Sequence, residues 1–170
     1  MKGDACSALP FSEEHRAALK DACAEDEEIW AIYPMSFAPE YFDESLNGFL
    51  ARPAMITFVL FDGETFAGMS SFLAIDEGRG VLEIGGTYYR PRLRGTGLNR
   101  RTKEMMLQRA FGCGFRRVEF KVDARNARSR AAMAKLGATE AAILPADRIT
   151  WTGHVRDTVL FSILKDEWPR

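Results

Sequence analysis

The chain of 170 residues contains little cysteine and little histidine, which narrows the chemistry open to it. Its three cysteines, Cys6, Cys23 and Cys113, are odd in number and do not have metal-binding spacing. The two histidines, His15 and His154, lie far apart, and neither CxxC nor HxxxH occurs. We therefore expect reduced thiols, as is usual in the cytoplasm, and no metal site.

Long apolar runs and an excess of one charge are also missing. No stretch reaches the roughly 18 apolar residues that span a bilayer, and the first residues lack the pattern of a secretory signal. The formal net charge of -1 argues against a general affinity for nucleic acid. We expect a cytoplasmic protein that binds neither membrane nor nucleic acid. Apolar residues make up 46% of the chain, enough for the core of a single domain over residues 1–170.

An arginine-rich segment at residues 88–101 joins two strongly patterned elements. The apolar run 81–89 predicts a strand, and residues 98–113 carry apolar side chains at helical spacing. The turn and the helix start contain Arg92, Arg94, Arg100 and Arg101. Each cation is unfavourable at a helix N-terminus by roughly 0.3–1 kcal/mol. A bound anion reverses this effect, so we interpret the segment as a phosphate-binding turn.

Two common phosphate-binding loops do not fit this turn. A P-loop requires Gly-Lys before Ser or Thr, and the chain contains no Gly-Lys pair. A dinucleotide-binding fingerprint requires a third glycine where Arg100 stands.

The remaining pattern resembles the acyl-CoA pyrophosphate loop of the GNAT superfamily of N-acetyltransferases, Gln/Arg-x-x-Gly-x-Gly/Ala. Arg94-x-x-Gly97-x-Asn99 fits this pattern except at its last place. Arg92-x-x-Gly95-x-Gly97 fits it formally, so two registers that differ by two residues stay open. Asn in the last place is familiar in the ribosomal-protein N-terminal acetyltransferases and their relatives.

The predicted order of elements, β-α-α-β-β-β-α-β-α-β-β, is also the GNAT order. Strands are expected at residues 5–11, 55–61, 64–75, 81–89, 117–123, 138–151 and 155–164, and helices at residues 12–23, 39–52, 98–113 and 127–136. The resemblance implies an α/β (α+β) fold with a mixed, mostly antiparallel central sheet flanked by helices. In such a fold the strands 81–89 and 117–123 splay apart. The pair Gly85-Gly86 predicts a bulge or a ligand close to the backbone.

The resemblance also implies how acetyl-CoA would bind. The loop provides as cofactor-binding candidates Tyr89, Arg92, Arg94, Gly95, Thr96, Gly97, Leu98, Asn99 and Arg100. GNAT proteins place an Asn after the strand corresponding to 117–123, followed by a helix that ends in Lys-x-Gly-Phe or similar. Here Asn126 and Lys135-Leu136-Gly137-Ala138 stand in those places. Asn126 would bind the pantetheine arm, or it would simply cap the helix.

Acetyl transfer from a thioester to an amine requires a proton acceptor, a donor to the oxyanion and a proton for the thiolate. Many GNAT enzymes use a Tyr seven residues after the Asn as the acid, and Met133 stands there. In the ribosomal-protein branch a Ser three residues after the Asn has this role, which makes Ser129 the candidate. Ser129 is otherwise a local cap. Backbone N–H groups at Gly85-Gly86 are candidate donors to the thioester oxygen.

The proton acceptor is less well defined. The branch places a Glu where this chain has Arg148, and the neighbouring Asp147 would face the other side of an ideal strand. Glu83 lies in an otherwise apolar strand and is either the proton acceptor or a paired structural carboxylate. A chain of water molecules could replace both.

Two further segments bear on the substrate. Gly153-x-x-Arg156-Asp157 and the Glu-Trp-Pro at 167–169 resemble the same branch, and His154 is more typical of a turn residue than of a base. The acidic residues 25–28 either form a solvated surface or attract a cationic substrate.

We expect an acetyl-CoA-dependent N-acetyltransferase that acetylates a primary amine, a protein N-terminus or a small molecule, by direct transfer. The alternative is a catalytically weak acyl-CoA-binding module of the same fold, because Met133 and Arg148 occupy expected catalytic places. A nucleic-acid binder that uses the arginines is less favoured, given the net charge. The resemblance also allows a homodimer.

Overall fold

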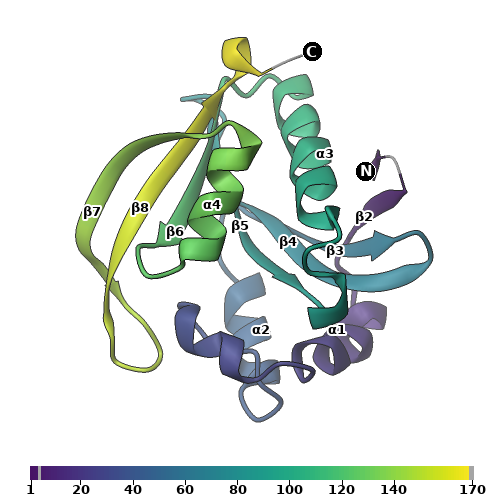
Figure 1. The fold of residues 1–170 in the computed structure, drawn as a ribbon. Helices are drawn as coiled ribbons and strands as arrows, with labels where there is room; N and C mark the ends of the chain where they lie inside the picture. The colour runs from purple at the N-terminus through teal and green to yellow at the C-terminus, as the bar shows by residue number, and fades with distance from the viewer. Residues whose placement is uncertain (4, 169–170) are drawn as a thin grey trace.

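The structure, a computed structural model, describes residues 1–3 and 5–168 and is built on one eight-stranded sheet (Figure 1). The strands run in the order β1-β2-β3-β4-β5-β6-β8-β7. Their bounds are Lys2–Gly3 (β1), Cys6–Pro10 (β2), Ile56–Asp62 (β3), Thr65–Asp76 (β4), Val81–Tyr89 (β5), Arg117–Asp123 (β6), Thr139–Ile149 (β7) and Val155–Leu164 (β8). The α-helices are Arg16–Cys23 (α1), Phe42–Leu50 (α2), Leu98–Gly112 (α3) and Ala127–Leu136 (α4). Short 3-10 turns lie at Glu13–His15, Glu28–Ile32, Pro91–Leu93 and Lys165–Glu167.

The parallel pair β5 and β6 creates the opening in the sheet. All other neighbouring strands pair antiparallel. The pairing of β5 with β6 covers only residues 81–83 and 117–119, so the two strands separate beyond Glu83. This confirms the mixed, mostly antiparallel sheet and the splayed strands expected from the sequence.

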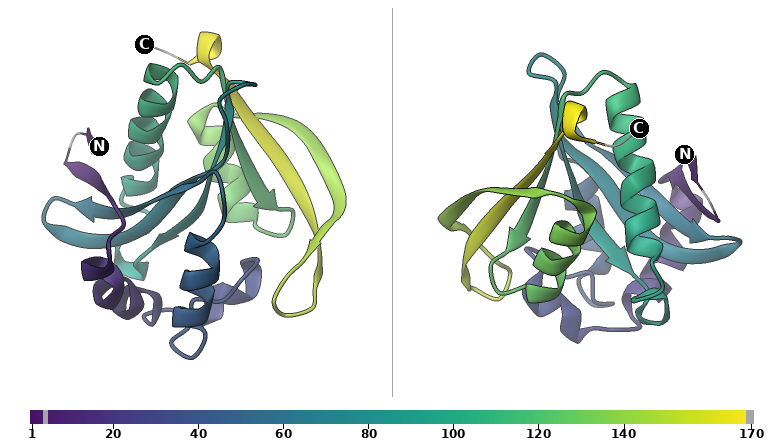
Figure 2. Two further views of the ribbon diagram at one scale, coloured as in Figure 1. Left: turned by 180° about the vertical axis from the view of Figure 1, so that it is seen from behind. Right: turned by 45° about the horizontal axis from the view of Figure 1, so that its top comes forward.

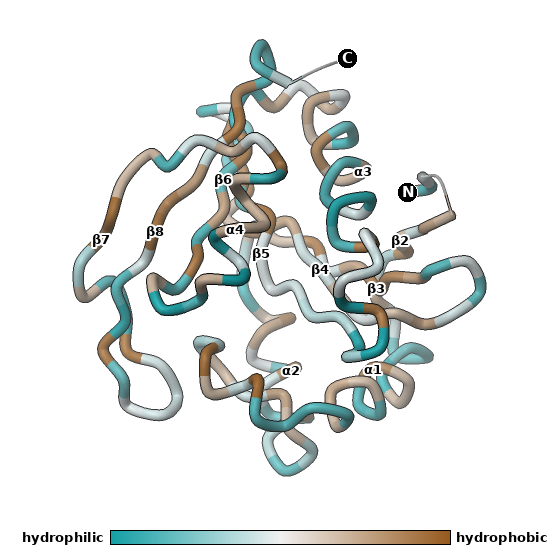
Figure 3. Tube along the Cα trace, viewed as in Figure 1, coloured by the Kyte–Doolittle hydropathy of each residue, from teal (hydrophilic) through white to brown (hydrophobic). Residues whose placement is uncertain are grey.

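Helices cover both faces of the sheet (Figures 1 and 2). One core packs α3 and α4 against one face and includes Leu82, Ile84 and Met106. A second core packs α1 and α2 against the other face and includes Trp30 and Tyr88. Figure 3 shows hydrophilic and hydrophobic residues alternating along α3, as expected of a helix with one buried face.

The glycine pair in β5 forms the bulge expected from the sequence. Between the pairs Met69–Tyr88 and Ser71–Gly85, one residue of β4 faces two residues of β5. Gly86 has a φ of +56°, and a Cβ there would lie 2.6 Å from Phe49 Cζ. The extra residue reverses the side-chain alternation. Ile84 therefore packs with the α3 core, whereas Tyr88 packs with the α1 core.

The N-terminal elements differ in detail from those expected. β1 pairs with β2 and extends the sheet by one strand beyond the strand expected at residues 5–11. The helix expected at residues 12–23 begins after Ser12 with a 3-10 turn, becomes α-helical at Arg16 and ends at Cys23 as expected. α2 begins at Phe42 rather than at Pro39, because Tyr41 N–H closes a turn onto Ala38 O before the helix starts. Pro169, part of the C-terminal resemblance, lies outside the described residues. Among the described helices, none combines the length and the apolar character required to cross a membrane.

Candidate active site

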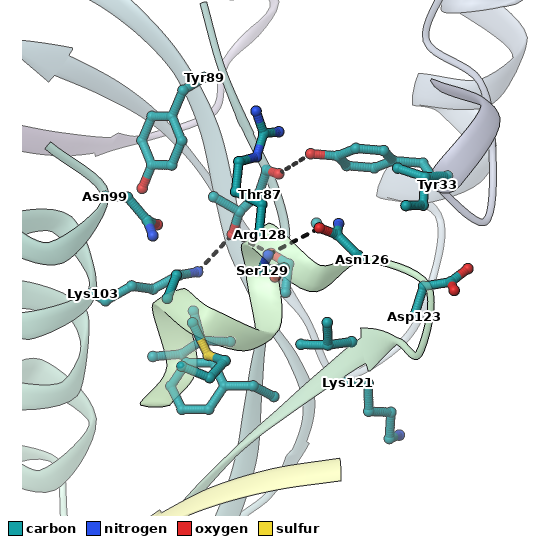
Figure 4. Close-up of a pocket in the computed structure, with 18 of the residues that line it drawn as sticks. Tyr33, Thr87, Tyr89, Asn99, Lys103, Lys121, Asp123, Asn126, Arg128 and Ser129 are labelled. Atoms are coloured by element: carbon teal, nitrogen blue, oxygen red, sulfur yellow. Dashed lines mark hydrogen bonds between the residues drawn. The ribbon is translucent and has the colours of Figure 1, made fainter. Parts of the chain in front are cut away.

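A cavity of about 780 Å³ opens where β5 and β6 separate. Its walls are residues of β5, β6, α3 and α4, the segment before α2, and the hairpin of β7 and β8. Figure 4 shows Lys103 of α3, Thr87 of β5, and Asn126 and Ser129 at the start of α4 around this space.

Most of the site residues expected from the sequence line this cavity. They are Tyr89, Arg94, Gly95, Gly97, Asn99, Arg100, Asn126, Glu83 and Ser129. Three expected residues do not line it. Leu98 is fully buried in the core, Thr96 is exposed and donates its hydroxyl to Leu93 O, and Arg92 is exposed.

The turn before α3 leaves backbone donors unused. Gly95 and Gly97 have φ values of +82° and +83°, a left-handed conformation that favours glycine. The first helical hydrogen bond runs from Arg101 N–H to Gly97 O at 3.1 Å. The N–H groups of residues 98–100 therefore have no partner within the helix, as at the start of any α-helix. Such an N-terminus suits an anion.

Three of the four arginines named in the turn and at the helix start are paired with carboxylates. Arg94 pairs with Asp26, Arg100 Nε lies 2.7 Å from Glu104 Oε1, and Arg101 Nη2 lies 3.0 Å from Asp62 Oδ1. These pairs offset the charge of the three arginines, so the arginines alone do not require a bound anion. What remains for an anion is the free backbone N–H groups.

The acidic segment 25–28 supplies two of the partners of the arginine-rich turn. Glu25 pairs with Arg90, and Asp26 with Arg94. Half of this segment therefore serves to hold the N-terminal region against the turn. This leaves less of its charge to attract a cationic substrate.

Asn126 caps α4. Its side-chain oxygen accepts a hydrogen bond from Ser129 N–H at 2.9 Å. Asn126 therefore caps the helix, which was the alternative to binding the pantetheine arm. Its amide nitrogen is still available to a ligand. Ser129 is half-buried on the cavity wall, and Met133 is buried in the same wall.

Glu83 lies in an ion pair at the point where the strands separate. Its Oε2 is 3.2 Å from Lys121 Nζ, and its side chain is only 13% exposed. The other oxygen, Oε1, lies 2.8 Å from the place that a Cβ on Gly85 would occupy. Gly85 therefore leaves the space that the Glu83 carboxylate fills. Glu83 is therefore a paired carboxylate, and it also lines the cavity.

A bulge in β7 changes the geometry expected for Asp147. The register shifts between Leu144 and Arg148, and Ala146 has a φ of +49°. Asp147 Oδ2 accepts hydrogen bonds from Arg148 Nε at 2.8 Å and Thr158 Oγ1 at 2.9 Å. The alternation of an ideal strand does not apply here. Although burial raises it, these two bonds lower the pKa of Asp147 overall, which makes it a poor proton acceptor.

Lys103 is a site residue that the sequence analysis missed. It is 4% exposed, and its Nζ donates a hydrogen bond to Thr87 Oγ1 at 2.6 Å (Figure 4). Burial lowers the pKa of Lys103 to about 7, although the nearby Glu83 opposes this shift. Its spacing of four from Asn99 and from Leu107, on the inner face of the helix, was the available signal.

Tyr33 was also missed. It lies on the cavity wall, and its hydroxyl donates to Thr87 O at 2.7 Å (Figure 4). Burial raises the pKa of Tyr33 to about 12, so the hydroxyl stays protonated. Thr87 is thus bonded on both sides, which fixes the backbone beside the bulge.

Comparison with known proteins decides the family. A sequence-family profile described as "Acetyltransferase (GNAT) domain" matches residues 9–139. The chain belongs to the GNAT acetyltransferase family. This confirms the resemblance seen in the loop and in the order of elements, and with it the acetyltransferase class. Acetyltransferases of this family use acetyl-CoA as the acetyl donor.

Solved structures support the same assignment for the GNAT chain. A candidate GNAT acetyltransferase from Chromobacterium violaceum is 30% identical, has a TM-score of 0.90, and aligns over 98% of this chain and 86% of its own. A candidate acetyltransferase from T. thermophilus is 31% identical at a TM-score of 0.90, over 99% of this chain and 90% of its own.

The ribosomal-protein branch is a more distant match. The ribosomal-protein-S5-alanine acetyltransferase from Vibrio fischeri is 16% identical at a TM-score of 0.77, over 100% of this chain and 98% of its own. At this identity the match shows the shared fold alone. No curated protein matches the chain. The acceptor of this GNAT protein therefore has to be argued from its own residues.

Proposed function

We propose that this GNAT domain moves the acetyl group of acetyl-CoA directly to a primary amine in the cavity between β5 and β6. The observation that carries the proposal is a juxtaposition. The unpaired N–H groups at the start of α3, a ready anion site, border the cavity that opens beside the β5 bulge. Left-handed Gly95 carries no Cβ and has nothing within 4 Å in that direction, which leaves room for a phosphate.

The proposed binding roles follow the cavity wall. The N–H groups of residues 98–100 would bind the pyrophosphate, with Arg100 and Asn99 beside it. The free amide nitrogen of Asn126 would bind the pantetheine arm while its oxygen keeps the helix capped. When bound, acetyl-CoA supplies an acetyl group already activated as a thioester.

The proposed chemical roles belong to three side chains. The amine nitrogen forms a bond to the acetyl carbon, the carbon–sulfur bond breaks, and one proton leaves the nitrogen. Glu83 accepts that proton, and Ser129 donates a proton to the departing sulfur and regains one from solvent. Lys103 is a second candidate acceptor, because its lowered pKa leaves much of it neutral near pH 7.

The acceptor, the location and the assembly are proposed more broadly. The amine belongs to a protein N-terminus or to a small molecule. The sparse cysteines favour the cytoplasm. A homodimer suits the branch that the sequence resembles. The weak-module alternative rests on Met133, which fills the wall where many GNAT enzymes carry a Tyr.

The first experiment is thermal unfolding with acetyl-CoA, CoA or ATP. A ligand at about 100 times its dissociation constant adds about 2.7 kcal/mol to the free energy of unfolding. We expect both CoA species to raise the melting temperature and ATP to leave it unchanged. An equal shift with ATP, or none with acetyl-CoA, would overturn the placement of the donor.

Replacement of the proton-transfer groups should separate an enzyme from a binding module. We expect Glu83→Gln and Ser129→Ala each to lower turnover by roughly 10²–10⁴-fold, since positioned acids and bases contribute about that much. Their affinity for acetyl-CoA should be unchanged in calorimetric titration. The exposed Glu64→Gln is the matched control. Turnover in the two variants equal to that of the wild type would remove both residues from the mechanism.

A further inference from the structure

Arg156 is a buried cation on the cavity wall. Arg156 is 3% exposed and lies in β8 directly opposite Arg148 of β7. Its Nε donates to Thr158 Oγ1 at 3.0 Å, and Thr158 in turn donates to Asp147. Within residues 1–3 and 5–168, no group accepts a hydrogen bond from its buried Nη2, and no salt bridge joins it to a carboxylate. The hydrogen bond to Thr158 positions the side chain, and its positive charge has no paired carboxylate among the described residues.

The carboxylates around Arg156 are committed to other cations. Glu83 pairs with Lys121 at 3.2 Å, and Asp123 pairs with Arg125 at 2.8 Å. The third neighbour, Asp147, pairs with Arg148, as described above. An arginine stays charged under all ordinary conditions, and a buried charge without a counter-ion is unfavourable. Burial and the nearby Arg148 lower the pKa of Arg156, although Asp123, Asp147 and Glu83 oppose this shift.

Further cations lie on the same cavity. Arg52, just beyond the end of α2, lies over the Phe49 ring with its guanidinium carbon 5.2 Å from the ring centre. Arg128, in the first turn of α4, also lines the cavity and is exposed. Glu83 and Asp123 are the lining carboxylates among the described residues, and both are paired. A polycationic acceptor would meet net repulsion in this space.

We propose that the acceptor amine carries an anionic group, a carboxylate or a phosphate, which Arg156 binds. This rests on the proposed acetyl transfer and adds the class of its acceptor. A guanidinium binds either anion through two parallel hydrogen bonds, and Arg156 has terminal N–H groups to spare. The β7–β8 hairpin and α3 lie on opposite sides of α4 (Figure 1), so this anion site is separate from the free N–H groups of α3.

The test compares amines that differ in one anionic group. The pairs are glycine with glycinamide, and glucosamine 6-phosphate with glucosamine; spermidine is the cationic probe. We expect the anionic member of at least one pair to be acetylated with a kcat/KM at least about tenfold higher, as expected for one added charge-assisted contact. The two pairs distinguish a carboxylate from a phosphate.

Substitution then ties the preference to Arg156. Arg156→Gln should remove the advantage of the anionic amine mainly through KM, and Arg156→Lys should restore part of it. Arg109→Gln, at an exposed arginine of α3 away from the cavity, removes the same charge and should leave the preference unchanged. An Arg156→Gln enzyme that keeps the preference would overturn the proposal.

Binding gives a readout that does not depend on turnover or on the variant. Wild-type protein saturated with CoA should bind the anionic member of the preferred pair more tightly than its neutral partner in calorimetric titration. If Arg156→Gln fails to fold, this wild-type comparison decides. Equal binding and equal acetylation of spermidine and the anionic amines would overturn the acceptor class and leave acetyl transfer intact. Absence of any acetyl-CoA binding would instead overturn the proposed function itself.

Discussion

Gly97→Val is expected to weaken the binding of acetyl-CoA by on the order of 100-fold or more while the fold persists. Gly97 is the N-cap of α3 and has a φ of +83°, which a β-branched residue rarely adopts. A Cβ there would lie 3.4 Å from Arg101 Nη1, and a valine would force the turn that presents the free N–H groups to change shape. Loss of two charge-assisted hydrogen bonds at about 1.5–3 kcal/mol each accounts for the size of the effect.

The strain of the substitution can be separated from its effect on binding. Gly114, just beyond the other end of α3, has a φ of +97° and open space around it, and it does not line the cavity. Gly114→Val should therefore lower the melting temperature by a similar amount. The further rise in the melting temperature of Gly114→Val with saturating acetyl-CoA should match that of the wild type, whereas the rise for Gly97→Val should be much smaller. Normal affinity in Gly97→Val would mean that the phosphates bind elsewhere.

Local pattern was enough to predict most of the elements. β5, β6, α4 and β8 have the bounds expected from apolar periodicity and from glycine and asparagine at their ends. The bulge at Gly86 was predicted for the same reason, because few residue types other than glycine tolerate its positive φ. Such signals act within a few residues, so a single sequence reveals them.

Side-chain pairing between distant segments was not predictable in this way. The Arg94–Asp26 pair joins residues 68 positions apart, and nothing local marks Asp26 as its partner. Without that pair, the arginines of the turn looked as if they needed an external anion. Arg156 shows the reverse case. Its lack of a counter-ion becomes visible only when the carboxylates of three strands are seen to be paired already.

The bulges decide where alternation can be used to assign the face of a residue. Alternation predicts the face of each residue only while the pairing register is regular. The sequence marks the bulge in β5 with two glycines but gives no such mark in β7, where an alanine takes the positive φ. Alternation therefore could not assign the side of Asp147, whereas the neighbouring Arg148 lines the cavity.

Lys103→Met is expected to make the protein more stable at neutral pH. The ordinary pKa of a lysine is 10.5, and burial lowers that of Lys103 to about 7 in the folded protein. Between these values the unfolded chain holds a proton that the folded protein has released. The free energy of unfolding therefore rises with pH in this window, by about 1.4 kcal/mol per pH unit, until the pH passes 10.5. Below pH 7 both states hold the proton, and the penalty of the buried charge is complete.

Methionine removes this penalty and fills a similar volume. At pH 7 we expect Lys103→Met to gain roughly 2–4 kcal/mol, and the gain should vanish as the pH approaches 10.5. In the variant, Ser70 and Thr87 lose their hydrogen bonds from the lysine. Their hydroxyls lie 2.7 Å apart in the wild type and can still bond each other. Urea denaturation of both proteins from pH 6.5 to 10 measures the effect. The exposed Lys165→Met is the control and should follow the wild-type curve.

A parallel pH dependence in Lys103→Met and wild type would show that Lys103 does not titrate in this window. If the predicted gain is found, this lysine is retained at a cost to stability, which is typical of a residue kept for function. Turnover then assigns that function. A rise of kcat/KM through pH 7 that is present in the wild type and absent in Lys103→Met would make Lys103 the proton acceptor in place of Glu83.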